Sequence, residues 1–201
     1  MDYINAPVNI KSFYDDLLFA TECNDFELVT YLITSILKII NSQQERYVFK
    51  VSINYSFLKA CEVGNLNLIS LFLFHGADIN EFGNLAIKIS CINGSLDNIK
   101  YLLQEGAKFG EDDNWDMKYA IMGGHTEIVE YIIKKKYYHV NDILLFINLA
   151  SQCLQHKIVL YFIRKYKFNV DNFMKIYPEF NNYISNIIEE QRQINKNKNK
   201  K

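Results

Sequence analysis

The segment Ala60-Cys61-Glu62-Val63-Gly64-Asn65 recurs in register along this chain, with its glycine repeated every 30 residues at Gly64, Gly94 and Gly124. A small pair precedes each glycine, and two mainly apolar doublets four residues apart follow it. In the first of these copies the doublets are Leu68-Ile69 and Phe72-Leu73. Doublets at this spacing indicate a helix that buries a wide face. The chain is therefore predicted to be built from repeats.

The glycine is predicted to end a short helix in a left-handed conformation, so that the chain reverses into a second, antiparallel helix. Asp25, Asn65 and Ser95 stand at the N-cap position of these second helices, where a polar side chain satisfies backbone amides. His125 and Gln155 stand there as weaker caps. One hairpin cannot bury both of its apolar faces, so neighbouring hairpins must stack into a continuous core.

The frame extends to five units. Leu154 replaces the turn glycine in the last unit, which is expected to turn differently. The insertion after the first unit is interpreted as an extension of that unit's second helix, followed by a loop. The predicted division of the chain is an N-terminal segment 1–14, five degenerate repeats at about 15–36, 54–80, 84–109, 114–137 and 144–169 with an insertion at 37–53, a C-terminal helical cap at 170–190 and a disordered Lys/Asn-rich tail at 191–201.

These residues resemble an ankyrin repeat. The most complete copy combines Ala60 to Asn65 and its two doublets with Gly76-Ala77-Asp78-Ile79-Asn80. The usual ankyrin period is about 33 residues, whereas this period is 30, and the short variant is similar to repeats of large DNA viruses of amoebae and other protists. The resemblance implies an all-α, ankyrin-type solenoid of stacked helical hairpins with short turns and helical end caps.

Composition and charge narrow the possible function. The 201-residue chain is 49% hydrophobic with a formal net charge of −1, and one elongated domain is expected. It shows no signal peptide and no membrane span, so an intracellular, cytoplasmic protein is expected, in a host cell if the source is viral. Residues 192 to 201 carry five cations and no acid. The remainder is expected to be acidic, which argues against repeats that bind nucleic acid.

No catalytic or cofactor motif is present, since the chain lacks a phosphate-binding loop, a GxSxG elbow and an HExxH sequence. We predict a protein that is not an enzyme and that takes no cofactor, no metal and no small-molecule substrate. The cysteines lie in repeat positions without a CxxC pair, which favours packed, reduced thiols over a zinc site. They are Cys23, Cys61, Cys91 and Cys153.

Binding is expected at positions of the first helices that the repeat frame leaves free. The candidate partner-binding residues are Ile89, Ile92, Asp112, Asp113, Trp115, Asp116, Tyr119 and Met122. They form an aromatic centre with an acidic rim, which would select a basic or amide-rich partner. The alternative is that these side chains pack beneath neighbouring turns.

The predicted function is a protein–protein interaction module that binds its partner on a concave face. One alternative is a substrate adaptor for a ubiquitin ligase, because Tyr177-Pro178-Glu179-Phe180 is faintly similar to the start of an F-box. Another is a nucleic-acid or membrane-surface binder that works through the basic tail, whose plainer interpretation is a solubilising end. A decayed paralogue without a partner is a further possibility.

Overall fold

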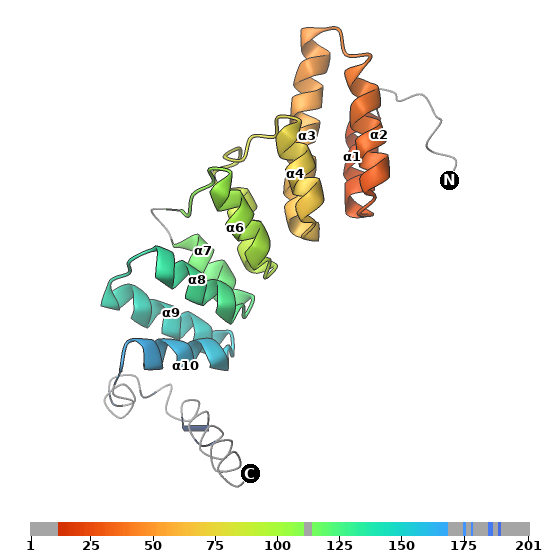
Figure 1. Ribbon diagram of the computed structural model, residues 1–201. Helices are drawn as coiled ribbons and strands as arrows, with labels where there is room; N and C mark the ends of the chain where they lie inside the picture. The colour runs from red at the N-terminus through yellow and green to blue at the C-terminus, as the bar shows by residue number, and fades with distance from the viewer. Residues whose placement is uncertain are drawn as a thin grey trace. The chain divides into compact units, whose positions relative to one another are not determined.

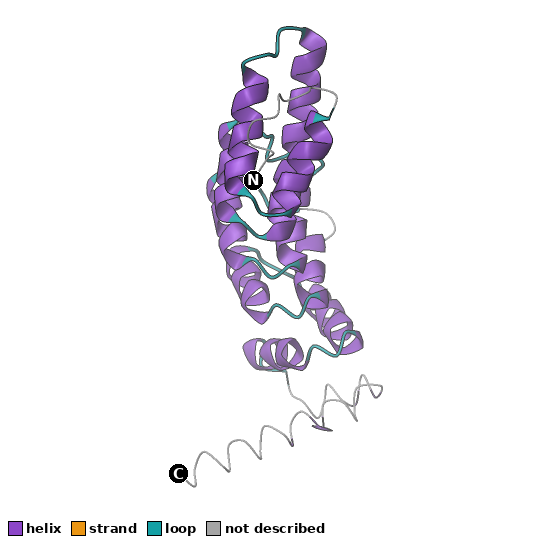
Figure 2. Cartoon of the chain, turned by 90° about the vertical axis from the view of Figure 1, so that its right-hand side faces the viewer, coloured by secondary structure: helices purple, strands orange, loops and turns teal. Residues whose placement is uncertain are grey.

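The fold is all-α, as the spacing of the apolar doublets and the resemblance to ankyrin repeats predict. The computed structural model describes residues 12–110 and 114–168, together with the isolated positions 175, 178, 185, 186 and 189. Within this part of the chain all regular structure is helical and no strand occurs (Figures 1 and 2). The helices are α1 Phe13–Glu22, α2 Phe26–Leu37, α3 Gln43–Val63, α4 Leu66–Phe74, α5 Leu85–Ile92, α6 Leu96–Gln104, α7 Trp115–Met122, α8 Thr126–Lys135, α9 Val140–Gln152 and α10 His156–Lys165.

Helix pairs stack within each of two compact units, Met1–Asp116 and Met117–Lys201. In the first unit α1 packs on α2, α3 on α4 and α5 on α6. The first helices also pack on one another, α1 on α3 and α3 on α5, and α2 packs on α4. In the second unit α9 packs on α10, and α10 on α8. First helices thus contact first helices and second helices contact second helices, which is the arrangement of a repeat solenoid. The repeat boundaries themselves stay a prediction.

The same backbone turn joins the two helices of every pair. The residue after the left-handed position donates its N–H to the carbonyl of the small residue five positions earlier, at 2.8 to 3.2 Å in all five pairs. The donor and acceptor residues are Asp25 and Ala20, Asn65 and Ala60, Ser95 and Ser90, His125 and Ala120, and Gln155 and Ala150. Every acceptor residue is fully buried. A small residue is needed at this repeat position because the chain folds back directly over it.

The glycine prediction is confirmed, and the expectation for the last pair is wrong. Gly64, Gly94 and Gly124 have φ of 84°, 79° and 75°. Leu154 also takes the left-handed conformation, with φ of 57°, and the following Gln155 closes the same 2.8 Å bond. A non-glycine residue costs about 1–2 kcal/mol in this conformation. The stacked pair therefore imposes the turn even where the residue disfavours it.

The cap predictions are confirmed in part. The Asp25 carboxylate accepts a bond from the Leu28 N–H at 2.9 Å. The Asn65 side chain accepts from the N–H groups of Asn67 and Leu68 at 2.8 and 3.2 Å. The prediction for Ser95 is wrong, because its side chain makes no cap bond, and the weaker candidates His125 and Gln155 make none either. Gln155 instead donates from Nε2 to the Met122 carbonyl at 3.5 Å, between one turn and the next.

The interpretation of the insertion is also wrong. Helix α2 ends at Leu37, and the inserted residues lengthen the first helix of the second pair, α3, to 21 residues. A capping box starts this helix: the Glu45 N–H bonds the Ser42 hydroxyl at 3.2 Å, while the Ser42 N–H bonds the Glu45 carboxylate at 2.9 Å. The inserted turns lie against α1, where the Phe13 and Phe49 rings stack at 5.9 Å. This local cap and contact explain why the insertion continues forward into α3.

Several predicted segments lie outside the described residues. They are residues 1–11 of the N-terminal segment, almost all of the C-terminal cap at 170–190, the tail at 191–201 and, among the candidate site residues, Asp112 and Asp113. The F-box-like stretch at 177–180 is outside them too, apart from position 178.

Candidate functional site

Helix α7 carries the aromatic part of the candidate site. Trp115, Tyr119 and Met122 are spaced four and three residues apart, so they share one face of the helix. Trp115 is 40% exposed and Met122 is 47% exposed, while Tyr119 is half-buried. Asn114, which directly precedes the helix, has a left-handed φ of 52°. This helix face thus leaves large apolar side chains open to solvent next to a fully buried Ala120.

Asp116 does not belong to an exposed acidic rim, and its assignment to the partner-binding set is corrected. Its side chain is only 2% exposed, and Oδ2 accepts a 2.6 Å hydrogen bond from the Gly110 N–H. The bond links Gly110 to the first turn of α7. The reason is helical geometry, since a residue next to Trp115 points about 100° away from it, toward the packed side.

Helix α5 carries the other apolar candidates. Ile92 is 41% exposed and Ile89 is half-buried. With a spacing of three residues, they share a face of α5. Both belong to the first compact unit, whereas Tyr119 and Met122 belong to the second. The structure brings together Ile89 with Ile92 on one helix, and Trp115 with Tyr119 and Met122 on the other.

Three of the four corresponding positions in the first two repeats are charged, namely Glu22, Lys59 and Glu62, and the fourth is Phe19, which is 64% exposed. The Lys59 ammonium lies 2.8 Å from the Glu62 carboxylate and 3.1 Å from that of Glu22 on the neighbouring first helix. Hydrogen bonds to Glu62 and Glu22 raise the pKa of Lys59 above its ordinary value. An exposed ion pair of this kind contributes little stability. The ion pairs add charge to α1 and α3, where Phe19 and Tyr55 are also exposed.

The cysteines are divided by burial. Cys61 and Cys91 are fully buried, while Cys23 is exposed and Cys153 is half-buried; all four are free thiols. Burial raises the pKa of Cys61 to about 12. Burial also raises the pKa of Cys91, with a smaller contribution from the charge of Asp116. Thiols that stay protonated are poor nucleophiles and poor metal ligands, so these two act as small core residues. In the described part of the chain, no three potential metal ligands lie together.

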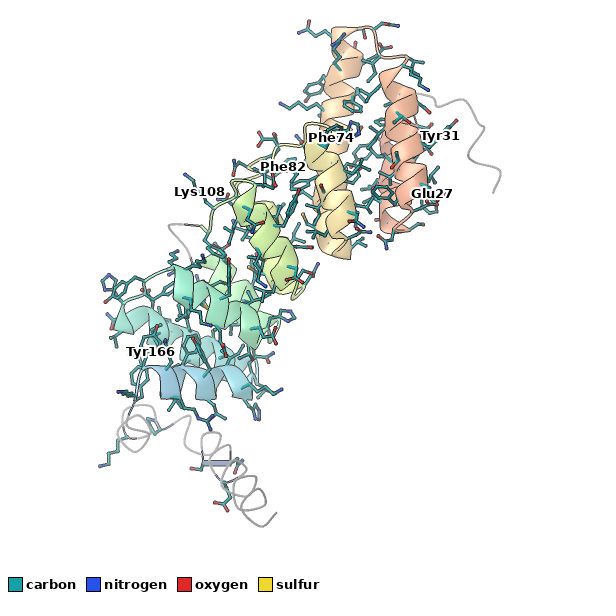
Figure 3. The ribbon with its side chains drawn as sticks, viewed as in Figure 1. Glu27, Tyr31, Phe74, Phe82, Lys108 and Tyr166 are labelled. Atoms are coloured by element: carbon teal, nitrogen blue, oxygen red, sulfur yellow. The ribbon has the colours of Figure 1, made fainter. Side chains whose placement is uncertain are left out.

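The sequence interpretation missed two grooves between second helices. One lies between α2 and α4, has a volume of about 330 Å³ and is lined by Phe26, Leu71 and Phe74, among others. Phe74 stands at the end of α4 and is 83% exposed (Figure 3). The other lies between α8 and α10, has a volume of about 480 Å³ and is lined by several cations. Sequence alone signals the second groove through the basic residues that recur along α10.

The expectation of an acidic folded body is wrong for the second unit. Residues 117–168 carry eight Lys or Arg and three Asp or Glu. The described residues of the first unit carry seven Lys or Arg and twelve Asp or Glu. The net charge of the whole chain hides this separation of charge between the units, and a count of charged residues in each repeat reveals it.

A family model for ankyrin repeats in three copies matches residues 17–113 and 57–144, together more than half of the chain. The chain belongs to the ankyrin-repeat family. The fifth helix pair of this ankyrin-repeat protein extends beyond the matched range, yet it uses the same turn as the others. No curated protein matches the sequence at a significant level. Among the described helices, none has the length and hydropathy needed to cross a membrane.

Proposed function

We propose that this ankyrin-repeat protein binds a protein partner through its first-helix surface, centred on the Trp115, Tyr119 and Met122 face of α7. Ankyrin repeats are in general protein-interaction modules and are typically not enzymes. The observation that carries the proposal is the exposure of Trp115 and Met122 on a regular helix whose opposite face is fully buried.

The chemistry of this face suits an interface centre. Tryptophan and tyrosine are enriched among the residues that contribute most to binding, because they bury a large area with few rotatable bonds. A helix holds them in place before the partner arrives, which lowers the entropy cost of association. Ile89 and Ile92 supply a second apolar face on α5. The ion-paired surface of α1 and α3 is expected to contribute less, since Lys59 already has its carboxylate partners.

The test is affinity capture from cell lysate with the triple variant Trp115→Ala, Tyr119→Glu, Met122→Glu at about 150 mM salt, where exposed charges are well screened. The control replaces exposed residues outside the first helices, Phe74→Glu with Tyr137→Glu. Both variants must first match the wild-type helix content by circular dichroism. We expect the triple variant to lose a protein that wild type and control both retain. Loss from the control alone, or equal capture by all three, contradicts the proposal.

Binding through the lysine tail is distinguished by salt. An interaction that neutralises phosphates weakens steeply with ionic strength, whereas binding to an apolar helix face does not. Deletion of residues 192 to 201 is therefore expected to leave partner capture unchanged. A large loss on deletion would favour the tail-mediated alternative.

A further inference from the structure

The groove between α8 and α10 is built by one face of α10 and part of α8. Lys157, Leu160, Tyr161, Arg164 and Lys165 line it from α10, and they recur at the spacings that place side chains on one helix face. Thr126 and Glu130 line it from α8. All these residues belong to the second compact unit, and α8 packs on α10. The groove of about 480 Å³ has room for a few side chains of another molecule.

Two cations of this groove are available to a ligand. Within the described residues, neither Lys157 nor Lys165 makes an ion pair with an acid. Other lysines of the same unit are engaged, since Lys135 lies 5.7 Å from the Tyr131 ring centre and Lys136 lies 5.5 Å from that of Tyr138. The excess of positive charge in residues 117–168 adds a favourable field for an acidic ligand.

The middle of the groove is apolar rather than cationic. Leu160 and Tyr161 are half-buried. Burial raises the pKa of Tyr161, and the negative charge of Glu130 raises it further. The Glu130 carboxylate would repel the phosphates of a nucleic acid that ran along the groove. A ligand that fits must therefore present apolar groups to Leu160 and Tyr161, and its acids to Lys157 and Lys165.

We propose that this groove is a second interaction surface, which binds an acidic, amphipathic helical segment of a partner protein. Carboxylates of the segment pair with Lys157 and Lys165, and its apolar residues cover Leu160 and Tyr161. This surface is formed by second helices, so it is separate from the first-helix face of the proposed function. The groove between α2 and α4 carries no cation in its lining and specifies no such ligand.

The test measures fluorescence anisotropy of a labelled helical peptide of about 16 residues, long enough to form a marginal helix, with leucines along one face and glutamates beside them. It is titrated with the full chain, with Lys157→Glu plus Lys165→Glu, and with the control Lys134→Glu plus Lys167→Glu. The control makes the same change in net charge on exposed residues of the same unit that do not line the groove. We expect the groove variant to bind about ten- to thirtyfold more weakly, and the control less than about threefold more weakly. Leu160→Gln is expected to weaken binding as well.

Five results would overturn the inference. Equal losses in the groove variant and the control would assign binding to net charge or to the basic tail. Equal binding of a peptide with glutamine in place of glutamate would exclude charge recognition. Tighter binding of a single-stranded oligonucleotide, unaffected by Leu160→Gln, would make nucleic acid the ligand. No binding of the acidic peptide at about millimolar concentration, or self-association of the protein that the groove variant abolishes, would remove the proposed occupant.

Discussion

Replacement of Asp116 by alanine is expected to weaken the fold and to leave partner binding intact. The change removes the acceptor of the Gly110 N–H, which lies 2.6 Å from a carboxylate that is 2% exposed. A hydrogen bond to a charged group contributes about 1.5–3 kcal/mol. Two effects reduce the loss. Gly110 is only half-buried, so water can partly replace the lost acceptor, and removal of Asp116 also removes the cost of burying a charged carboxylate. We therefore expect the free energy of unfolding to fall by about 1.5–2 kcal/mol, the lower part of that range.

Urea denaturation followed by circular dichroism measures this loss. Asp116→Asn keeps an oxygen acceptor and is expected to lose about half as much, because the bond is no longer charge-assisted. Asp97→Ala is the matched control, since its carboxylate is exposed and pairs with Lys100 at 3.2 Å; it should cost less than about 0.5 kcal/mol. If Asp116→Ala is as stable as Asp97→Ala but captures less partner, the carboxylate acts at the surface and the structural reasoning fails.

Four further outcomes are expected. Ser42→Ala removes the cap of α3 and should lower the free energy of unfolding by about 1 kcal/mol in the same denaturation assay, whereas no change would mean that the inserted turns are held only by packing. Gly124→Ala should destabilise by about 1–2 kcal/mol through left-handed strain and contact with the Gln155 side chain, and adding Gln155→Ala should recover only the contact part. Thiol labelling of native protein should modify Cys23 and spare Cys61. Burial raises the pKa of Cys61 to about 12 from 9.0, so the stability contributed by burying this thiol is complete below pH 9 and is lost as the pH rises from there toward 12. Acrylamide should quench the fluorescence of Trp115, the only tryptophan, to an intermediate degree, and complete protection would contradict its place at an interface.

Much of the fold could be predicted from sequence because the same pattern recurs in five copies, so a deviation in one copy does not obscure it. Each copy supplies a weak helix signal, and five copies in register fix both helices of the pair. The turn at Leu154 was mispredicted for the same physical reason that makes the array stable. A residue's own preference is worth about 1–2 kcal/mol, and packing of the flanking helices outweighs it.

Errors arose where one contact decides the outcome. Ser42 and Glu45 have the spacing of a capping box, a local signal that would have started α3 at the correct place. The burial of Asp116 depends on where the chain brings Gly110, which no periodicity encodes. The groove of α8 and α10 depends on lateral packing of second helices, and only the clustering of cations along α10 hints at it.

The position of the longest helix has a consequence for how the protein is made. Helix α3 contacts α1, α4 and α5, so the N-terminal pairs hold the densest set of neighbours in their unit. Repeat arrays fold by adding neighbours to a stable nucleus, and domains begin to fold while the ribosome is still adding residues. A nascent chain that has released α1 to α4 already contains this nucleus. The third pair, α5 and α6, can then dock on α3 as it emerges from the exit tunnel, without waiting for the C-terminus.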